Sequence, residues 1–453
     1  MTGVGEPRAR LFPKDFIWGV SSTAYQLEGA VSEDGRGDSI WDRFCAMPGK
    51  VRNGESGAVA CDFYHRYRED VGLVSELGVD SFRFSVSWPR IMPSGRGEVN
   101  ERGFGFYDRL VDALLEAGIK PLIALYHWDL PQALEEEGGW TNRATVEAFA
   151  DYSRVVGEHF GDRVTLWVTQ VEPWVTAWLG YGLGMHAPGR CSEADAVAAS
   201  HHLLLSHGRA VEVLRGVAPR AEVGIALNLE HFWAATDRDD DHEALRWWDG
   251  TRSRWYLDPL FRGEYPADLL QEWEHLMPAG HNGDLACIAA PIDFLGVNNY
   301  SASAIGAGAG DDERARGVPQ PGAARTDMGW EIHPDGLRQV LTRVSRDYSP
   351  NTVYVTENGA AFPDVVDHEG RVLDPERQQY LEAHVDAAAR AAREGVPPKG
   401  YFVCGLMDNF EWNWGYWKRF GLVHVDYPTQ KRTPKASFGW YRDFIAAQRR
   451  SGQ

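Results

Sequence analysis

Eight short runs of β-branched and aromatic residues recur along the chain, and the stretches between them have the periodicity of helices. In residues 144–160, for example, apolar side chains recur three and four positions apart, as they do on the buried face of a helix. Eight strands that alternate with helices are typical of a closed parallel barrel of the (β/α)8 or TIM class. We therefore predict an α/β fold with a single such barrel. Its strands are expected within residues 16–26, 81–88, 121–128, 164–172, 222–229, 293–300, 352–357 and 401–412.

The chain of 453 residues has the length of about three average domains, but one barrel of this class often reaches that size. No repeat and no linker divides the sequence, so we predict one barrel domain over residues 1–453. Residues 301–325 are rich in Gly, Ala, Pro and charged side chains, and they follow the sixth expected strand. We expect a loop insertion at the barrel mouth there. It would serve as an entrance lid or a wall of the site, or it is a mobile surface insertion.

The acidic composition argues against several classes of partner. The 65 acidic and 46 basic side chains give a formal net charge of −19, which disfavours nucleic acids and anionic membranes. The sequence has no secretion signal at its start and no stretch near the ~18 apolar residues of a membrane span, so we expect a cytoplasmic protein. Its five widely spaced cysteines fit reduced thiols better than disulfides or a zinc site. We expect no metal, and we leave a homo-oligomer open.

Two glutamates stand at the ends of expected strands that face each other across the barrel. Glu172 ends the fourth strand in WVTQVEP, and Glu357 ends the seventh in YVTENG. Functional groups of such barrels gather at the carboxyl ends of the strands, so both side chains would enter one pocket. Two carboxyl groups placed in this way can take different roles in cleaving a glycosidic bond. One protonates the leaving oxygen, and the other attacks the sugar carbon. Either glutamate alone would more commonly be a surface or paired charge.

Two further side chains fit the same pocket. Arg83 ends the second expected strand, and a buried guanidinium there needs a carboxylate partner, for which Glu357 is the natural candidate. A structural ion pair elsewhere is the alternative. Tyr300 ends the sixth strand and is placed to donate a hydrogen bond to Glu357, with an ordinary core tyrosine as the alternative.

Many longer motifs make the chain similar to one known family. From Phe12 to Tyr441 it resembles the β-glycosidases of glycoside hydrolase family 1. The resemblance implies an enzyme without cofactor that releases a terminal β-linked sugar from a small-molecule glycoside by a retaining mechanism. The motifs are FIWGVSSTAYQLEGA, SFRFSVSWPRI, LYHWDLPQAL, the segment ending in Glu172-Pro173, HAPG, HHLLLSHGRAV, WYLDPLFRGEYP, TENG, DNFEW and RFGLVHVDY.

The resemblance also implies a role for each matching residue. Glu172 would be the general acid/base and Glu357 the nucleophile, with carboxyl groups roughly 5–5.5 Å apart as in retaining enzymes. Arg83, Asn298 and Tyr300 would support the nucleophile. The expected substrate-binding residues are Gln26, His127, Trp128, Val171, Cys404, Glu411, Trp412 and Phe420.

The pocket departs from the family pattern at two places. Val171 stands where the family has an asparagine that contacts the sugar 2-hydroxyl, and valine cannot make this bond. Cys404-Gly405 replaces a Trp-Ser pair whose indole forms the floor beneath the sugar ring. We therefore predict a modified sugar, 2-deoxy or 2-substituted, carried by a specialised metabolite. The alternatives are an ordinary β-glucosidase or β-galactosidase, a transglycosylase, and a glycoside-binding protein with little turnover.

Overall fold

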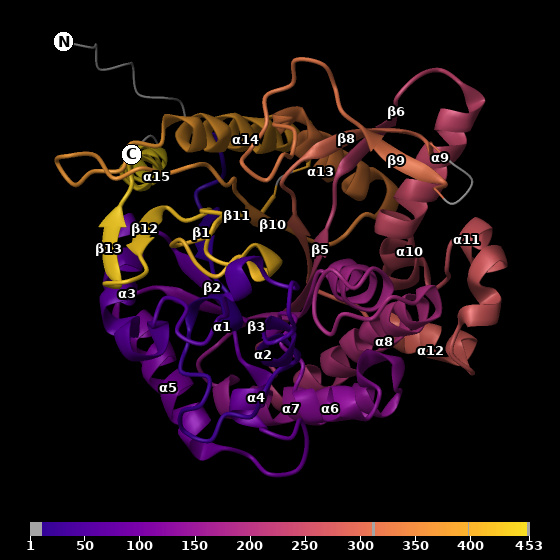
Figure 1. The fold of residues 1–453 in the computed structure, drawn as a ribbon, viewed down its shortest axis with the longest axis horizontal. Helices are drawn as coiled ribbons and strands as arrows, with labels where there is room; N and C mark the ends of the chain where they lie inside the picture. Colours follow the sequence, from indigo (N-terminus) through magenta and orange to yellow (C-terminus); the bar gives the residue numbers. More distant parts are fainter. Residues whose placement is uncertain (1–10, 310–312, 397, 451–453) are drawn as a thin grey trace.

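The computed structural model describes residues 11–309, 313–396 and 398–450, and a closed barrel of eight parallel strands forms its centre (Figure 1). Each barrel strand overlaps one of the eight runs expected from the sequence, so the predicted (β/α)8 barrel is confirmed. The strands are β1 (Ile17–Ser21), β2 (Ser81–Ser85), β3 (Lys120–Tyr126), β4 (Leu166–Val171), β5 (Glu222–Asn228), β7 (Phe294–Asn298), β10 (Val353–Asn358) and β11 (Gly400–Cys404).

The order of strands around the barrel is β1-β11-β10-β7-β5-β4-β3-β2. The barrel closes because β1 pairs in parallel with two strands, with Val20 opposite Phe82 of β2 and opposite Val403 of β11. Apolar side chains such as Leu122 and Phe402 fill the interior. The barrel is therefore a packed core, and its open end is left to carry the functional groups.

Helices surround the strands because each one buries an apolar stripe against the barrel (Figure 1). In α13, for example, Leu337, Val340, Leu341 and Val344 form such a stripe at spacings of three and four. The long helices are α3 (Phe63–Leu77), α5 (Glu101–Glu116), α7 (Ala144–Phe160), α8 (Glu193–Val217), α13 (Pro334–Tyr348), α14 (Pro375–Arg393) and α15 (Ala436–Arg450).

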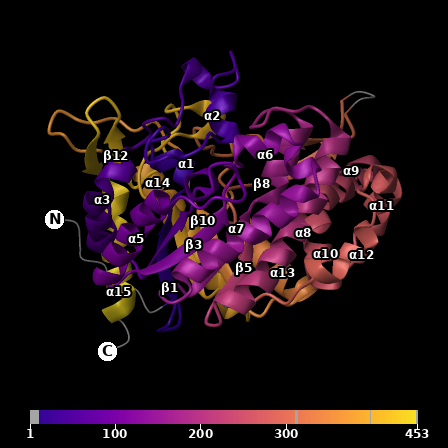
Figure 2. The same ribbon diagram turned by 90° about the horizontal axis from the view of Figure 1, so that it is seen from below.

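Shorter helices lie mainly in the connections at the ends of the strands. In the turned view of Figure 2, α2, which follows the carboxyl end of β1, lies at the top, and α15 reaches the bottom. No helix among the described residues is both long and apolar enough to cross a membrane. The short helices are α1 (Ala24–Leu27), α2 (Ile40–Cys45), α4 (Trp88–Ile91), α6 (Gln132–Glu136), α9 (Asp239–Asp249), α10 (Trp255–Arg262), α11 (Ala267–Trp273) and α12 (His281–Ile288).

The segment 301–325, expected to be a loop, contains two strands. β8 (Ala302–Ala307) pairs with β9 (Ala315–Val318) and with β6 (His231–Ala234), and the three strands form a small sheet outside the barrel (Figure 1). The expectation of a loop was wrong for β8 and β9. Their Gly- and Ala-rich sequences have little intrinsic preference for a strand. Pairing with the remote β6 and an apolar cluster shared with α9 stabilise the strands instead. Residues 310–312 of this segment lie outside the described residues.

A short hairpin completes the fold on the C-terminal side. β12 (Val423–Asp426) and β13 (Lys431–Pro434) pair in antiparallel fashion. The hairpin follows the long connection after β11, in which Asp408–Trp412 and Phe420 lie. Lys435, between β13 and α15, lies against this connection, since its backbone N–H donates to the carbonyl oxygen of Leu422.

Candidate active site

Glu172 and Glu357 lie at the carboxyl ends of β4 and β10, at the same end of the barrel. Glu172 follows the last residue of β4, and its backbone N–H donates to the carbonyl oxygen of Ala226 in β5 at 2.8 Å. Glu357 is the penultimate residue of β10 and pairs in register with Asn298 of β7. The two glutamates are only 7% and 5% exposed. Carboxylates buried to this degree need hydrogen-bond or charge partners.

Asn298 connects the surroundings of the two glutamates. Its amide nitrogen donates to Glu172 Oε1 at 2.7 Å, and its amide oxygen accepts from Thr356 Oγ1 at 2.7 Å. The pKa of Glu172 is raised to about 8, mainly by burial and to a smaller extent by the negative charge of Glu357. The hydrogen bond from Asn298 acts in the opposite direction and lowers this pKa. We expected Asn298 to support Glu357, but it contacts Glu172. The hydroxyl of Thr356 binds the amide oxygen, and so the donor end points at Glu172.

Glu357 accepts hydrogen bonds on both of its oxygens. Arg83, which is fully buried on β2, donates to Oε1, and the hydroxyl of Tyr300 donates to Oε2. Arg83 also donates to the carbonyl oxygen of Thr356 at 3.2 Å, which fixes the guanidinium between β2 and β10. Charge-assisted donors of this kind stabilise a carboxylate anion and set its direction. Arg83 and Tyr300 therefore contact Glu357 as expected from the sequence.

A second polar group of the site is built around Gln26 of α1, which follows β1. Its amide nitrogen donates to Glu411 Oε2 at 3.2 Å, to the carbonyl oxygen of Phe410 at 3.0 Å and to Asn409 Oδ1 at 3.3 Å. Its amide oxygen accepts from Thr23 Oγ1 at 2.8 Å. Burial raises the pKa of Glu411 to about 8, while the bond from Gln26 opposes this shift. Donors and acceptors therefore stand side by side here, as recognition of a neutral sugar requires.

His127 and two tryptophans form the adjoining wall. The Trp412 ring lies 4.6 Å from the Trp128 ring and 5.9 Å from the His127 ring, centroid to centroid. Burial and the charge of Arg83 hold the pKa of His127 well below its usual range, so the imidazole is neutral. Its Nδ1 lies 3.3 Å from Arg83 Nη2. Since Arg83 can only donate, Nδ1 accepts, and Nε2 carries the proton that a ligand oxygen can accept.

Three of these site residues have backbone conformations that side chains other than glycine rarely adopt. The φ angles of Glu172, Trp128 and Trp412 are 51°, 77° and 50°. Such conformations cost of order 1–3 kcal/mol each and persist only where surrounding contacts hold them. The indole N–H of Trp128 donates to the carbonyl oxygen of Val171 at 2.9 Å, which is one such contact. The strain is concentrated at the pocket, as is common for functional sites.

At the two positions that depart from the family pattern, the side chains do not offer the contact to a sugar that the family's residues make there. Val171 is fully buried and packs among the apolar side chains of the barrel interior. Cys404 ends β11 and is partly exposed, and burial raises the pKa of its thiol, which stays neutral. The ring of Phe420 lies 6.0 Å from Tyr300 and 6.1 Å from Trp330, so these three aromatics line the edge beside Glu357.

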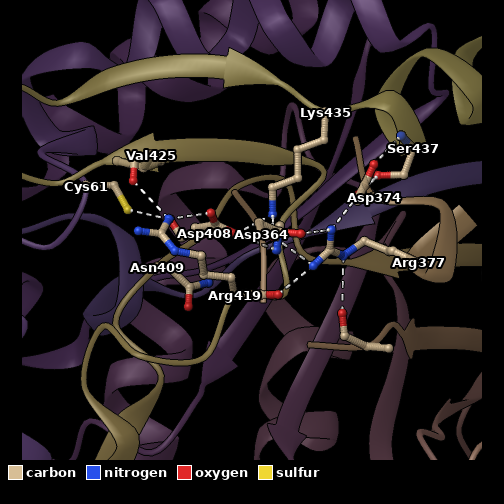
Figure 3. A network of polar contacts seen from close by, with 12 residues as sticks. Cys61, Asp364, Asp374, Arg377, Asp408, Asn409, Arg419, Val425, Lys435 and Ser437 are labelled. Atoms are coloured by element: carbon tan, nitrogen blue, oxygen red, sulfur yellow. Dashed lines mark hydrogen bonds and ion pairs between the residues drawn. The ribbon is translucent and has the colours of Figure 1, made fainter. Parts of the chain in front are cut away.

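A buried network of charges supports the turn that carries Glu411 and Trp412 (Figure 3). Asp408, which directly precedes Asn409, accepts from Lys435 Nζ at 2.6 Å and from Arg419 at 2.7 Å. Lys435 also binds Asp364, and Arg377 binds Asp364 at 2.9 Å. Removal of one partner from a buried pair typically costs about 3–5 kcal/mol, so the network fixes this turn firmly. The motif DNFEW contains Asp408, but its partners Arg419 and Lys435, and the further members Asp364 and Arg377, lie outside this motif, and sequence reasoning missed their contacts.

Sequence reasoning also missed two neighbours of the glutamates. Thr356 orients Asn298, and the negative charge of Glu230 adds to the rise in the pKa of Glu172. Thr356 lies in the motif TENG, but nothing in that motif signals its contact with Asn298, and Glu230 lies in none of the motifs. Among the described residues, no group of three or more His, Cys, Asp and Glu side chains is arranged to hold a metal ion.

Comparison with known proteins identifies the chain. The family model described as "Glycosyl hydrolase family 1" matches residues 8–450. The chain belongs to glycosyl hydrolase family 1. It is therefore a glycoside hydrolase of the retaining kind, and the resemblance noted in the sequence is confirmed.

Relatives within family 1 are similar over almost their full lengths. Beta-glucosidase A of Thermotoga maritima is 46% identical over 96% of this chain and 97% of the relative. The 1,4-beta-D-glucan glucohydrolase of Thermotoga neapolitana is 45% identical over 96% of this chain and 98% of the relative. The solved structure of the family 1 β-glucosidase from Thermotoga maritima superposes with a TM-score of 0.95 at 46% identity, covering 97% of this chain and 99% of that one.

Proposed function

We propose that this chain hydrolyses β-D-glucosides of small molecules, with Glu357 as nucleophile and Glu172 as general acid/base. The observation that carries the proposal is the contrast between the two carboxyl groups. Glu357 accepts from Arg83 and Tyr300, which stabilise an anion, whereas burial and the charge of Glu357 raise the pKa of Glu172 to about 8. The names of the two relatives above favour a glucoside as substrate.

The first chemical step follows from these two environments. At neutral pH, below a pKa of about 8, Glu172 is protonated and can give its proton to the glycosidic oxygen. The carboxylate of Glu357 attacks the anomeric carbon, the bond to the leaving oxygen breaks, and the aglycone departs as an alcohol. Arg83 and Tyr300 hold the attacking carboxylate in place. A carboxyl spacing of roughly 5–5.5 Å stays a prediction for this pair.

The second step uses the same pair with exchanged roles. Once Glu357 is an ester, its negative charge is gone, and with it one cause of the raised pKa of Glu172. The pKa of Glu172 therefore falls in the intermediate, and its ionised form can take a proton from water. The water attacks the anomeric carbon and releases Glu357, so the sugar keeps its original configuration.

Proton NMR of the first product tests this proposal. With 4-nitrophenyl β-D-glucoside as substrate, we expect β-D-glucose to appear first and to convert into the α-anomer only by slow mutarotation. Appearance of α-D-glucose first would contradict the assignment of Glu357 as nucleophile. Binding of the glucoside without turnover would instead favour the alternative of a glycoside-binding protein.

A second candidate is a sugar that is altered at the 2-position, and Val171 is the observation that favours it. The side chain directly before Glu172 is apolar and fully buried, and it offers no hydrogen bond to a 2-hydroxyl. Interactions at this hydroxyl strengthen in the transition state and contribute several kcal/mol in glycosidases that make them. An enzyme without them loses its preference for the intact glucoside.

Removal of the 2-hydroxyl from the substrate tests this second candidate. We compare kcat/KM for an aryl β-D-glucoside with kcat/KM for its 2-deoxy analogue, each divided by the uncatalysed rate of that substrate. In the natural protein the two values should differ by less than about tenfold, because about tenfold is the contribution of one ordinary hydrogen bond and Val171 does not make it. Val171→Asn should raise the preference for the glucoside by about tenfold or more. Val171→Leu, which adds size without an amide, is the matched control. A strong preference for the glucoside in the natural protein would contradict the second candidate and leave the first in place.

A further inference from the structure

A register shift in β10 sets Thr356 apart from the regular pairing of the barrel. Val355 of β10 pairs with Val297 of β7. The next pair is Glu357 with Asn298, so β10 has one residue more than β7 in this interval. The extra residue is Thr356, which is fully buried. Irregularities of this kind change the direction of side chains and are common beside functional sites.

The hydroxyl and the carbonyl oxygen of Thr356 each contact a residue that serves one of the two glutamates. The hydroxyl donates to the amide oxygen of Asn298 at 2.7 Å, and the amide nitrogen of Asn298 donates to Glu172 Oε1 at 2.7 Å. The carbonyl oxygen accepts from Arg83 at 3.2 Å, and Arg83 also donates to Glu357. Thr356 therefore connects the surroundings of the acid/base with those of the nucleophile.

The side chain of Thr356 packs closely against Gly296 of β7. A Cβ atom at Gly296 would lie 2.7 Å from the hydroxyl oxygen of Thr356 and 3.1 Å from the Cα atom of Ala226 in β5. The glycine therefore provides the space that the hydroxyl occupies. Ala226 pairs in register with Gly296, and its carbonyl oxygen accepts from the backbone N–H of Glu172. A continuous contact thus leads from Thr356 on β10 to the backbone of the acid/base.

The amide group of Asn298 depends on this hydroxyl for its orientation. Asn298 is buried, and in the part of the chain that the structure describes its amide group forms hydrogen bonds only with Glu172 and Thr356. A buried amide oxygen without a donor is unfavourable. Loss of the hydroxyl therefore allows the amide to turn, and the hydrogen bond to Glu172 weakens with it.

Glu172 needs this donor because it has to ionise among other charges. The charged and titratable groups around it are Glu357 on β10, Arg83 on β2, Tyr300 after β7 and Glu230 after β5. Burial and the two negative charges raise the pKa of Glu172, whereas the hydrogen bond from Asn298 and the charge of Arg83 lower it. In the second step of the proposed mechanism Glu172 takes a proton from water, and for this it must be a carboxylate.

We propose that Thr356 is a positioning residue for the acid/base. Its hydroxyl holds the amide of Asn298 with the N–H directed at Glu172 and so stabilises the carboxylate that the second step requires. This inference rests on the proposed function and adds to it a residue that acts through Asn298. Replacement of the Thr356 side chain leaves its carbonyl oxygen in place for Arg83, so variants at this position report on the acid/base.

The pH dependence of kcat/KM for 4-nitrophenyl β-D-glucoside tests this role. Thr356→Val replaces the hydroxyl by a methyl group of similar size. Because the hydrogen bond from Asn298 lowers the pKa of Glu172, its loss should move the midpoint of the alkaline decline upward by about one pH unit, a tenfold change in the proton equilibrium. Thr356→Ser keeps the hydroxyl and should keep the midpoint. Thr169→Val is the matched control, since the hydroxyl of Thr169 is buried on β4 but contacts His207 of α8 at 2.6 Å.

A second readout concerns the step in which Glu172 acts as a base. The leaving group of 2,4-dinitrophenyl β-D-glucoside needs no proton, so hydrolysis of the glycosyl-enzyme should limit kcat for this substrate. We expect Thr356→Val to lower this kcat by about tenfold, and azide, which attacks without base catalysis, to restore it. Thr169→Val should leave kcat unchanged. A decrease in Thr356→Val that azide does not restore would contradict the role of Thr356.

A double variant shows whether Thr356 acts through Asn298. In the background of Asn298→Ala, Thr356→Val should cause no further shift of the alkaline midpoint, because the amide that it orients is gone. A further shift of the same size in that background would overturn the inference.

The outcomes separate this inference from the function on which it rests. A natural protein that does not hydrolyse the aryl glucoside contradicts the proposed function. A natural protein that hydrolyses it, with the same alkaline midpoint as Thr356→Val, contradicts only the role of Thr356. If thermal unfolding shows that Thr356→Val is not folded, Thr356→Ala, which removes the hydroxyl and leaves room, is judged by the same criteria.

Discussion

Replacement of Glu357 by glutamine is expected to lower kcat for aryl β-D-glucosides by more than about 10⁴-fold, as loss of a covalent nucleophile does in other enzymes. The amide cannot form the ester intermediate, and it also withdraws the anionic partner of the buried Arg83. In the natural protein, 2-deoxy-2-fluoro-β-D-glucosyl fluoride should leave a covalent sugar on the peptide that contains Glu357. Steady-state kinetics and peptide mass spectrometry measure the two effects.

A matched control separates chemistry from stability in this experiment. Asp70 is buried and binds Arg432 with both oxygens at 2.9 and 3.0 Å, so Asp70→Asn also breaks a buried carboxylate–arginine pair, but outside the pocket. Both variants should lose stability, since a broken buried pair typically costs about 3–5 kcal/mol. Only Glu357→Gln should lose activity per folded molecule. A sugar adduct on any other residue would contradict the role of Glu357.

Replacement of Glu172 by glutamine is expected to lower kcat/KM by about 10²–10⁴-fold for leaving groups that need a proton. The loss should be smaller for 2,4-dinitrophenyl β-D-glucoside, whose leaving group is stable as an anion. The pH profile gives a second readout. Because Glu172 acts in its protonated form and its pKa is raised to about 8, kcat/KM of the natural protein should hold below that pH and decline as pH rises through it. The variant should lack this alkaline decline.

The alkaline decline also distinguishes Glu172 from another carboxyl group. Burial raises the pKa of Glu411 to about 8 as well, so the two groups titrate in the same range. If the decline persists unchanged in Glu172→Gln, it belongs to Glu411 or another group, and the assignment of Glu172 is wrong. Azide provides the positive control, because this small anion can attack the glycosyl-enzyme without base catalysis. It should restore turnover of the dinitrophenyl substrate in the variant with β-glucosyl azide as product.

The barrel could be predicted because its strands are buried on both faces. Such parallel strands appear in the sequence as nearly continuous apolar runs, and eight of them separated by helical periodicity leave few other folds. The small sheet of β6, β8 and β9 was missed. The segments ASAIGA and ARGV have weak strand preference, and backbone pairing with β6, about 70 residues earlier, is not encoded in any local pattern.

For the site, the sequence by itself determined which residues reach the pocket. Glu172, Glu357 and Tyr300 lie at or just after the carboxyl end of a strand, whereas Arg83 lies in the middle of β2 and was expected at its end. Parallel strands of one barrel bring their carboxyl ends to one face. The contacts of Arg83 and Tyr300 with Glu357 were also expected from the sequence, but the other side-chain partners were not. Asn298 was expected at Glu357 and contacts Glu172, because a hydroxyl one strand away fixes its orientation.

The tertiary structure alone decided how these groups behave chemically. The pKa of Glu172 depends on burial and on a charge 185 residues away, and the turn with Glu411 is held by Asp408, Lys435 and their partners from separate segments. Strand periodicity and motifs record which side chains face inward. Electrostatics and hydrogen bonding depend on distances between side chains from different strands, and these exist only once the barrel has closed.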